Sequence, residues 1–73
     1  MMYLYHTKVG AFAIIHRADR WHITFRNEVL GSYEYAQQAA KDLACGHTST
    51  PPGWLDTSKL GIPEDISEWT WVG

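Results

Sequence analysis

Two neighbouring segments in the first half of the chain have a period of two, which restricts them to extended strands. The alternation of apolar and polar residues is clear in residues 21–26, whereas in residues 11–17 the second side carries Ala13, Ile15 and Arg17. The apolar side carries Phe12, Ile14 and His16 in residues 11–17, and Trp21, Ile23 and Phe25 in residues 21–26. Ala18-Asp19 between them is short enough for a two-residue hairpin turn. Pairing Arg17 with Arg20 brings the two apolar sides together, with Ile14 opposite Ile23.

A third strand is expected from Val29 to Tyr33, after a turn at Asn27-Glu28. Pairing Arg26 with Val29 places Leu30 opposite Phe25 on the apolar side. The same pairing places Tyr33 beside His22 on the other side. Gly31 indicates a bulge or a close approach of backbone. Residues 3–7 alternate weakly, and the pattern leaves open whether they extend the first strand or form a short one.

The period then changes from two to 3.6. Ala36, Ala39, Ala40 and Leu43 follow the i, i+3, i+4, i+7 spacing of one helical stripe, and Gly46 is a typical helix stop. We therefore predict an α+β fold, in which a three-stranded antiparallel β-meander packs on one α-helix.

Residues 47–73 have little regular pattern. Residues 47–53 have turn and loop composition, and Pro63 suits the first position of a short helical turn. Seven large apolar residues among the last twenty predict that this tail packs on the body: Trp54, Leu55, Leu60, Ile62, Ile66, Trp69 and Trp71. We expect a single domain over 1–73, with sheet and helix in 1–46 and a packed tail in 47–73.

Length, cysteine content and charge exclude several classes of protein. With 73 residues and one cysteine, the chain has no disulfide framework. No run approaches the roughly 18 apolar residues of a membrane span, and residues 1–10 lack the features of a signal peptide. We therefore expect a cytoplasmic protein of bacterial type. The formal charge is +2 over residues 1–33, −1 over 34–46 and −3 over 47–73.

No set of residues in the sequence has the spacing of a catalytic or metal centre. Cys45-Gly46-His47 lacks zinc-ligand spacing, and His47 is better placed to cap the predicted helix. The acidic residues Glu64, Asp65 and Glu68 suit the start of a helical turn. We expect no cofactor, no metal and no enzymatic activity, which leaves a small enzyme or metal site as a remote alternative.

The side of the sheet away from the helix, together with the tryptophan-rich tail, is the candidate interaction surface. Its proposed members are Arg17, Arg20, His22, Thr24, Arg26, Tyr33, Trp54, Trp69 and Trp71. Arginine, tyrosine and tryptophan are enriched in protein-binding hot spots, which favours a protein partner or self-association. The same arginines could contact phosphates, so nucleic-acid binding is the alternative.

The run WHITFRNEVLGSYEYAQQAAKDLACG over residues 21–46, followed by His47-Thr48 and by LGIPEDISEW over 60–69, resembles a group of short uncharacterised bacterial proteins. The likeness covers about the last two-thirds of the chain, and it implies a fold without a known activity.

Residues 21–44 also resemble, more weakly, the plant ethylene-response-factor type of DNA-binding domain and its relatives in phage integrases. The pattern rests on Trp21, Leu30-Gly31, Tyr33, Ala36, Ala39 and Ala40. That resemblance implies a three-stranded sheet lying in the DNA major groove. The sheet's groove-facing residues would be Arg17, Arg20, His22, Thr24 and Arg26. The acidic net charge and the apolar tail depart from that family.

Overall fold

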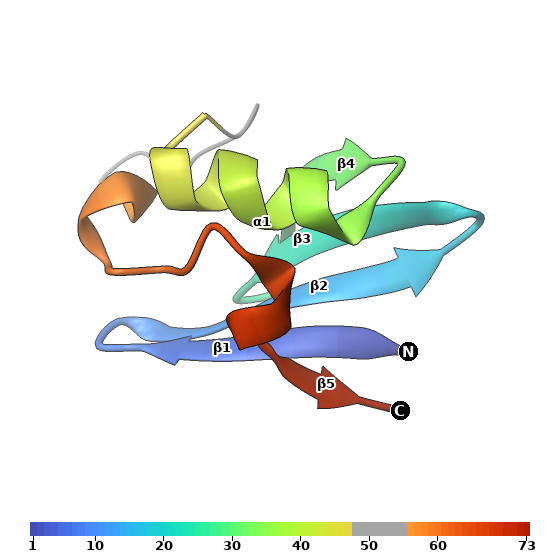
Figure 1. Ribbon diagram of the computed structural model, residues 1–73, viewed down its shortest axis with the longest axis horizontal. Helices are drawn as coiled ribbons and strands as arrows, with labels where there is room; N and C mark the ends of the chain where they lie inside the picture. The colour runs from blue at the N-terminus through green and yellow to red at the C-terminus, as the bar shows by residue number, and fades with distance from the viewer. Residues whose placement is uncertain (48–55) are drawn as a thin grey trace.

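A computed structural model of the protein describes residues 1–47 and 56–73. Its elements are β1 (Met2–Thr7), β2 (Gly10–Arg17), β3 (Arg20–Phe25), β4 (Glu28–Tyr33), α1 (Ala36–Cys45), the 3₁₀ turns η1 (Thr57–Lys59) and η2 (Ile66–Glu68), and β5 (Thr70–Val72). The strands form one antiparallel sheet in the order β4-β3-β2-β1-β5 (Figure 1). The predicted α+β class is correct, but the three-stranded meander is wrong, because the sheet has five strands.

The two strands beyond the predicted meander lie side by side at one edge of the sheet, and residues 3–7, left open by the sequence, belong to a strand of their own. β1 carries Tyr3 and Tyr5 on one side and Met2 and Leu4 on the other, so it lacks an alternation of apolar and polar residues. β5 has only three residues, which is too few to show any period. β5 pairs with β1 through Tyr3 and Trp71.

The β2–β3 hairpin has the predicted register, with Ile14 opposite Ile23 and Arg17 opposite Arg20. Ala18 and Asp19 both have positive φ, at 54° and 61°, the conformation of a type I′ turn. This turn matches the right-handed twist of the strands. On the inward side, the Phe12 and Phe25 rings stack with centroids 4.3 Å apart.

The β3–β4 turn lies one residue earlier than predicted. Arg26 and Asn27 occupy it with positive φ, and Phe25 pairs with Glu28, so the expected pairing of Arg26 with Val29 is wrong. Asparagine tolerates positive φ well, which favours this two-residue turn. The register then shifts between Ile23 and Thr24. This bulge, the one indicated by Gly31, brings Leu30 to the buried side although the turn lies one residue earlier.

The helix covers the apolar side of the sheet as expected. Ala39, Ala40 and Leu43 are buried, and Gly46 ends the helix in the left-handed conformation with φ 75°. The small alanine side chains let the helix lie close to the strands. The core is therefore built mainly from strand residues, and it comprises Phe12, Ile14, Ile23, Phe25, Leu30, Ala39, Ala40, Leu43, Ile62 and Trp69.

The described part of the tail packs on the same side of the sheet as the helix. η1 and η2 both contact α1, and Trp69 is only 5% exposed, with its ring 5.7 Å from that of Tyr5. The predicted helical turn starting at Pro63 is wrong, because η2 starts at Ile66. Asp65 precedes η2, and its carboxylate accepts a hydrogen bond from the Ser67 amide. Figure 1 shows α1 and this segment on one side of the sheet. No described residue covers the other side.

Candidate interaction surface

The register of the strands defines the sheet face opposite α1, here called the outer face. Paired residues point to the same side of a sheet, so the residues paired with His22 and Thr24 share their side. The outer face consists of Met2, Leu4, His6, Ala11, Ala13, Ile15, Arg17, Arg20, His22, Thr24, Val29, Ser32, Thr70 and Val72.

The centre of the outer face is apolar. Two adjacent rows cross the five strands: Val72, Met2, Ile15, His22 and Ser32 form one row, and Thr70, Leu4, Ala13, Thr24 and Val29 form the other. The central members of both rows keep part of their surface accessible, and the edge residues Val29 and Val72 are 56% and 36% exposed. The apolar band is the centre of these rows, formed by Met2, Leu4, Ala13 and Ile15 on β1 and β2. An accessible apolar patch of this kind is typical of a surface that binds another protein.

A basic cluster lies at one end of this band. Arg17 and Arg20 are directly opposed across the β2–β3 hairpin, and like charges in this position repel each other. Arg20 turns toward β4, where its Nε and Nη2 donate to the Ser32 hydroxyl (2.8 Å) and carbonyl (3.1 Å) oxygens. His22 Nε2 lies 3.2 Å from the Arg17 carbonyl oxygen, and as the Nε2–H tautomer it donates to it.

Arg26 does not belong to the outer face, contrary to the prediction from strand alternation. It lies in the β3–β4 turn, where its positive φ breaks the alternation. Its guanidinium lies 5.1 Å from the centroid of the inward-facing Phe25 ring. Its Nη2 donates to the Val9 carbonyl oxygen at 3.2 Å. These contacts tie one turn to another at the end of the sheet.

Tyr33 is also on the opposite side from its predicted position. The bulge pairs it with Trp21, on the side of the helix, where its hydroxyl interacts with the Asp42 carboxylate. Burial and then the interaction with Asp42 raise the pKa of Tyr33 to about 12. Tyr33 therefore connects β4 to α1 and is not part of a binding surface on the outer face.

The tryptophans of the tail do not extend the outer face. Trp69 is buried beneath the tail, and its Nε1 donates to the Pro63 carbonyl oxygen at 3.2 Å. Trp71 pairs with Tyr3 on the helix side, with the ring centroids 4.7 Å apart, and is 49% exposed at the sheet edge. Trp54 lies outside the described residues. Of the nine predicted residues, the outer face thus brings together Arg17, Arg20, His22 and Thr24.

Sequence reasoning missed the apolar centre, formed by Met2, Leu4, Ala13 and Ile15. Ile15 and Ala13 were assigned to the correct side of β2, but without β1 beside them they form only a narrow strip. The signal that could have revealed the band is that residues 2–5 are apolar on both sides. A strand that is apolar on both sides is typical of the interior of a sheet that is covered on both faces.

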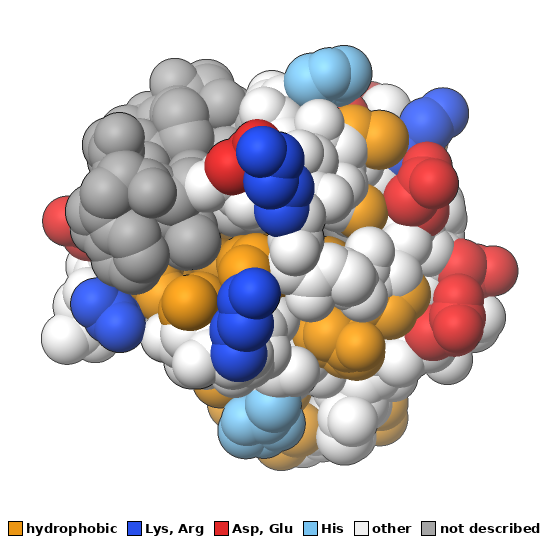
Figure 2. All heavy atoms as spheres, turned by 90° about the vertical axis from the view of Figure 1, so that its left-hand side faces the viewer, with side chains coloured by type: hydrophobic (Ala, Val, Ile, Leu, Met, Phe, Trp, Pro, Cys, Tyr) orange, Lys and Arg blue, Asp and Glu red, His pale blue; other side chains and the backbone are white. Residues whose placement is uncertain are grey.

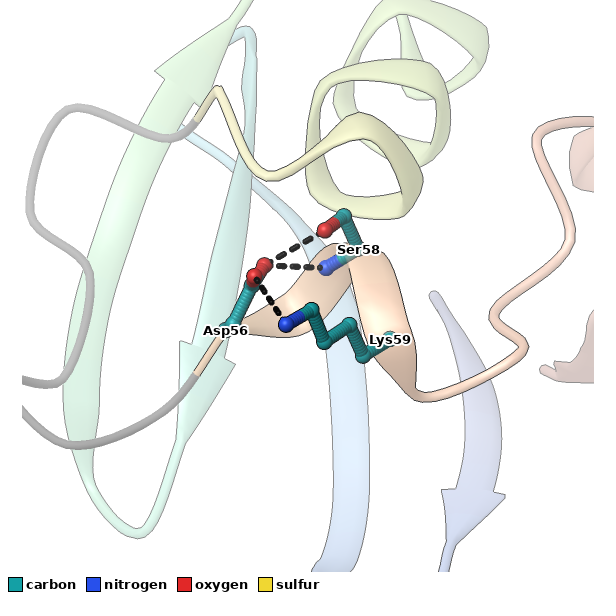
Figure 3. A network of polar contacts seen from close by, with 3 residues as sticks. All are labelled: Asp56, Ser58 and Lys59. Carbon is teal, nitrogen blue, oxygen red and sulfur yellow. Dashed lines mark hydrogen bonds and ion pairs between the residues drawn. The ribbon is translucent and has the colours of Figure 1, made fainter.

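The tail carboxylates act locally in the structure. Asp56 accepts hydrogen bonds from the Ser58 hydroxyl and amide at the start of η1, and its carboxylate lies 4.0 Å from Lys59 Nζ (Figure 3). The Ser58 hydroxyl, the Ser58 amide and then Lys59 hold the pKa of Asp56 below its usual value, and Ser67 does the same for Asp65. Within residues 1–47 and 56–73, no three His, Cys, Asp or Glu side chains are grouped to hold a metal.

Comparison with known proteins gives no information about the family or the function of this chain. No family model matches the chain, and neither the curated proteins nor the solved structures gave a match. The two sequence resemblances therefore stay predictions. In the part of the chain that the structure describes, no helix has the length and apolar character needed to cross a membrane. The geometry of the outer face is thus the basis for any statement about function.

Proposed function

We propose that this protein is a small non-enzymatic interaction module that binds a protein partner through its outer face. The observation that carries the proposal is the apolar band centred on Met2, Leu4, Ala13 and Ile15, which no described residue covers. Two-layer folds bury one side of the sheet under helices, and a second apolar side requires a further layer. A partner would supply that layer.

The polar groups around the band support a protein partner over nucleic acid. Arg20 and His22 already bond to backbone and side-chain oxygens of the sheet, and Arg26 lies in a turn away from the outer face. A groove-binding sheet needs cationic side chains that reach toward phosphates along its length. Here the centre of the face offers methyl and methylene groups, which suit an apolar protein surface.

Site-specific photo-crosslinking in native host cells tests the proposal. A benzophenone side chain replacing Thr24 places the reactive group in the centre of the outer face, and the same group replacing Gln38 places it on the exposed side of α1. We expect a protein adduct of defined mass from position 24 and none from position 38. The adduct protein, once purified, should bind the wild-type module and lose at least about tenfold in affinity for Ile15→Asp.

Two results would contradict the proposal. One is the absence of any position-24 adduct together with a strict monomer in analytical ultracentrifugation. The other is a salt-dependent shift of duplex DNA that Arg17→Glu abolishes and Ile15→Asp leaves unchanged, which would favour nucleic-acid binding instead.

A further inference from the structure

The charges of this protein are separated between its two layers. The sheet-forming residues 1–33 contain four basic and two acidic residues, a net charge of +2. Residues 34–73, which form the helix and the tail, contain two basic and six acidic residues, a net charge of −4. Figure 2 shows acidic side chains gathered along one edge of the molecule when it is seen from one end.

The charges do not cancel by direct contact between the layers. Within the described residues, Arg17 and Arg20 form no ion pair with a carboxylate, and the ion pair of the tail joins Lys59 to its own neighbour Asp56. The only acidic residue of the five strands is Glu28, which pairs with the inward-facing Phe25. The outer positions of the strands therefore carry arginine and histidine without any carboxylate.

Arg17 is the point on the outer face where a partner's charge would matter most. Arg20, opposite it across the hairpin, already donates to Ser32, whereas Arg17 forms no ion pair among the described residues. We infer that the partner of the outer face is an acidic amphipathic helix, whose apolar side covers the apolar band and whose carboxylates reach Arg17. This inference rests on the proposed function.

A helix matches the dimensions of the face. Five strands at about 4.8 Å spacing make a face roughly 20–25 Å wide, which a helix of about 16 residues crosses at 1.5 Å per residue. A second copy of the chain fits less well. Outer face against outer face would offer Arg17 no carboxylate from the outer positions of the strands. Outer face against helix would set the apolar band on the exposed polar residues Gln37, Gln38 and Lys41.

Three synthetic helical peptides of about 16 residues provide the probe. The first has leucines on one side and glutamates on the other, the second replaces the glutamates by lysines, and the third replaces the leucines by serines. Binding is followed through the methyl NMR signals of Leu4, Ala13 and Ile15. We expect the leucine–glutamate peptide to bind roughly tenfold tighter than either of the others, with an affinity that falls as salt is added.

A matched pair of charge reversals locates the effect. Arg17→Glu should weaken the leucine–glutamate peptide roughly fivefold or more, whereas Lys41→Glu, with the same change in net charge on the helix, should leave the affinity nearly unchanged. Equal binding of the glutamate and lysine peptides at the outer face would overturn the inference and leave the proposed function standing. Equal loss in the two variants, or no shift at the three methyl groups with any peptide, would also overturn it.

Discussion

At the residue scale, Gly31 and Tyr33 form a coupled pair at the β4 edge. A Cβ atom at position 31 would lie 2.9 Å from Tyr33 Cε2 and 3.0 Å from Tyr33 Oη, which is closer than packed atoms approach. The residue at position 31 must therefore lack a side chain if the Tyr33 ring is to lie over the strand. The ring in turn directs its hydroxyl to Asp42 on the helix. Glycine is thus required here because the site has no room for a Cβ atom, and not because the backbone adopts an unusual conformation.

Replacing Gly31 by alanine should displace the Tyr33 ring and disturb its interaction with Asp42. We expect Gly31→Ala to lower the free energy of unfolding by about 1–3 kcal/mol, measured by urea denaturation. The control is the same change in a Tyr33→Ala background, where the obstructing ring is gone and the cost should nearly vanish. Equal costs in the two backgrounds would show that the pair is not coupled.

The raised pKa of Tyr33 predicts a loss of stability in alkali. The pKa is about 12 in the folded chain against an ordinary value of 10.0, so the unfolded chain releases this proton first. The stabilisation is complete below about pH 10 and declines as the pH rises toward about 12. Urea midpoints at about pH 8 and about pH 11 should fall more for the wild type than for Tyr33→Phe. The remaining tyrosines contribute equally to both, and a parallel fall would contradict the prediction.

At the element scale, one glutamine of α1 holds the segment that leads into β5. Gln37 Nε2 donates to the Glu64 carbonyl oxygen at 2.9 Å, and Gln37 Oε1 accepts from the Ile66 amide at 3.0 Å. The Gln37 side-chain amide therefore binds one backbone carbonyl and one backbone amide of the tail, the same two kinds of group that a neighbouring β-strand would bind. This contact and the burial of Trp69 fix the path of residues 64–69.

Gln37→Leu should loosen the tail without changing the helix propensity. The loss of two partly exposed hydrogen bonds should cost about 1–2 kcal/mol and speed amide hydrogen exchange at Ile66. Gln38→Leu is the matched control, because Gln38 is exposed on the same helix and has no bond to residues 56–73 of the tail. The prediction fails if the two variants exchange at the same rate at Ile66.

How far the sequence predicts an element depends on how one-sided that element is. β3 alternates clearly, and the large residues Phe12 and Ile14 mark the inner side of β2, so the pairing and burial of the hairpin follow from the period of two. The helix likewise follows from its alanine stripe. The sequence left β1 open between an extension of the next strand and a strand of its own, because β1 is apolar on both sides, and β5 is too short to be predicted. The side of Tyr33 depended on a bulge and on a turn at Arg26, and neither has a periodic signal.

The same reasoning explains the partial success at the candidate surface. Arg17, Arg20, His22 and Thr24 lie in the hairpin whose alternation is clear, and the structure places them together on the outer face. Arg26 has positive φ, and Tyr33 follows both this turn and the β-bulge. From there on, every second residue no longer points to the side that the alternation predicts. Trp69 and Trp71 depend on the course of the tail, which local sequence does not determine.

At the scale of the whole molecule, the packed core lies on one side of the sheet only. Ile14 and Ile15 are neighbours in β2, yet Ile14 is fully buried beneath the helix and Ile15 is accessible on the outer face. The stability of the fold should therefore depend on one of them, and binding on the other. This separation lets the outer face change without loss of the fold.

Alanine at each of these neighbours tests the separation directly. Ile14→Ala should cost about 2–5 kcal/mol, most of the stability of so small a domain, whereas Ile15→Ala should cost about 1 kcal/mol or less. Thermal or urea unfolding of the two variants measures the contrast. Similar losses at both positions would mean that the outer face is packed, which would also contradict the proposed function.

The pairing of β1 with β5 joins residues about seventy positions apart, with Met2 opposite Val72. During synthesis the ribosome therefore releases β1 long before the strand that completes its edge has been made. Until then the growing chain presents a row of unpaired amides and carbonyls, the kind of edge that recruits other nascent strands. The sheet can close only after residue 72 has been synthesised and has left the ribosome.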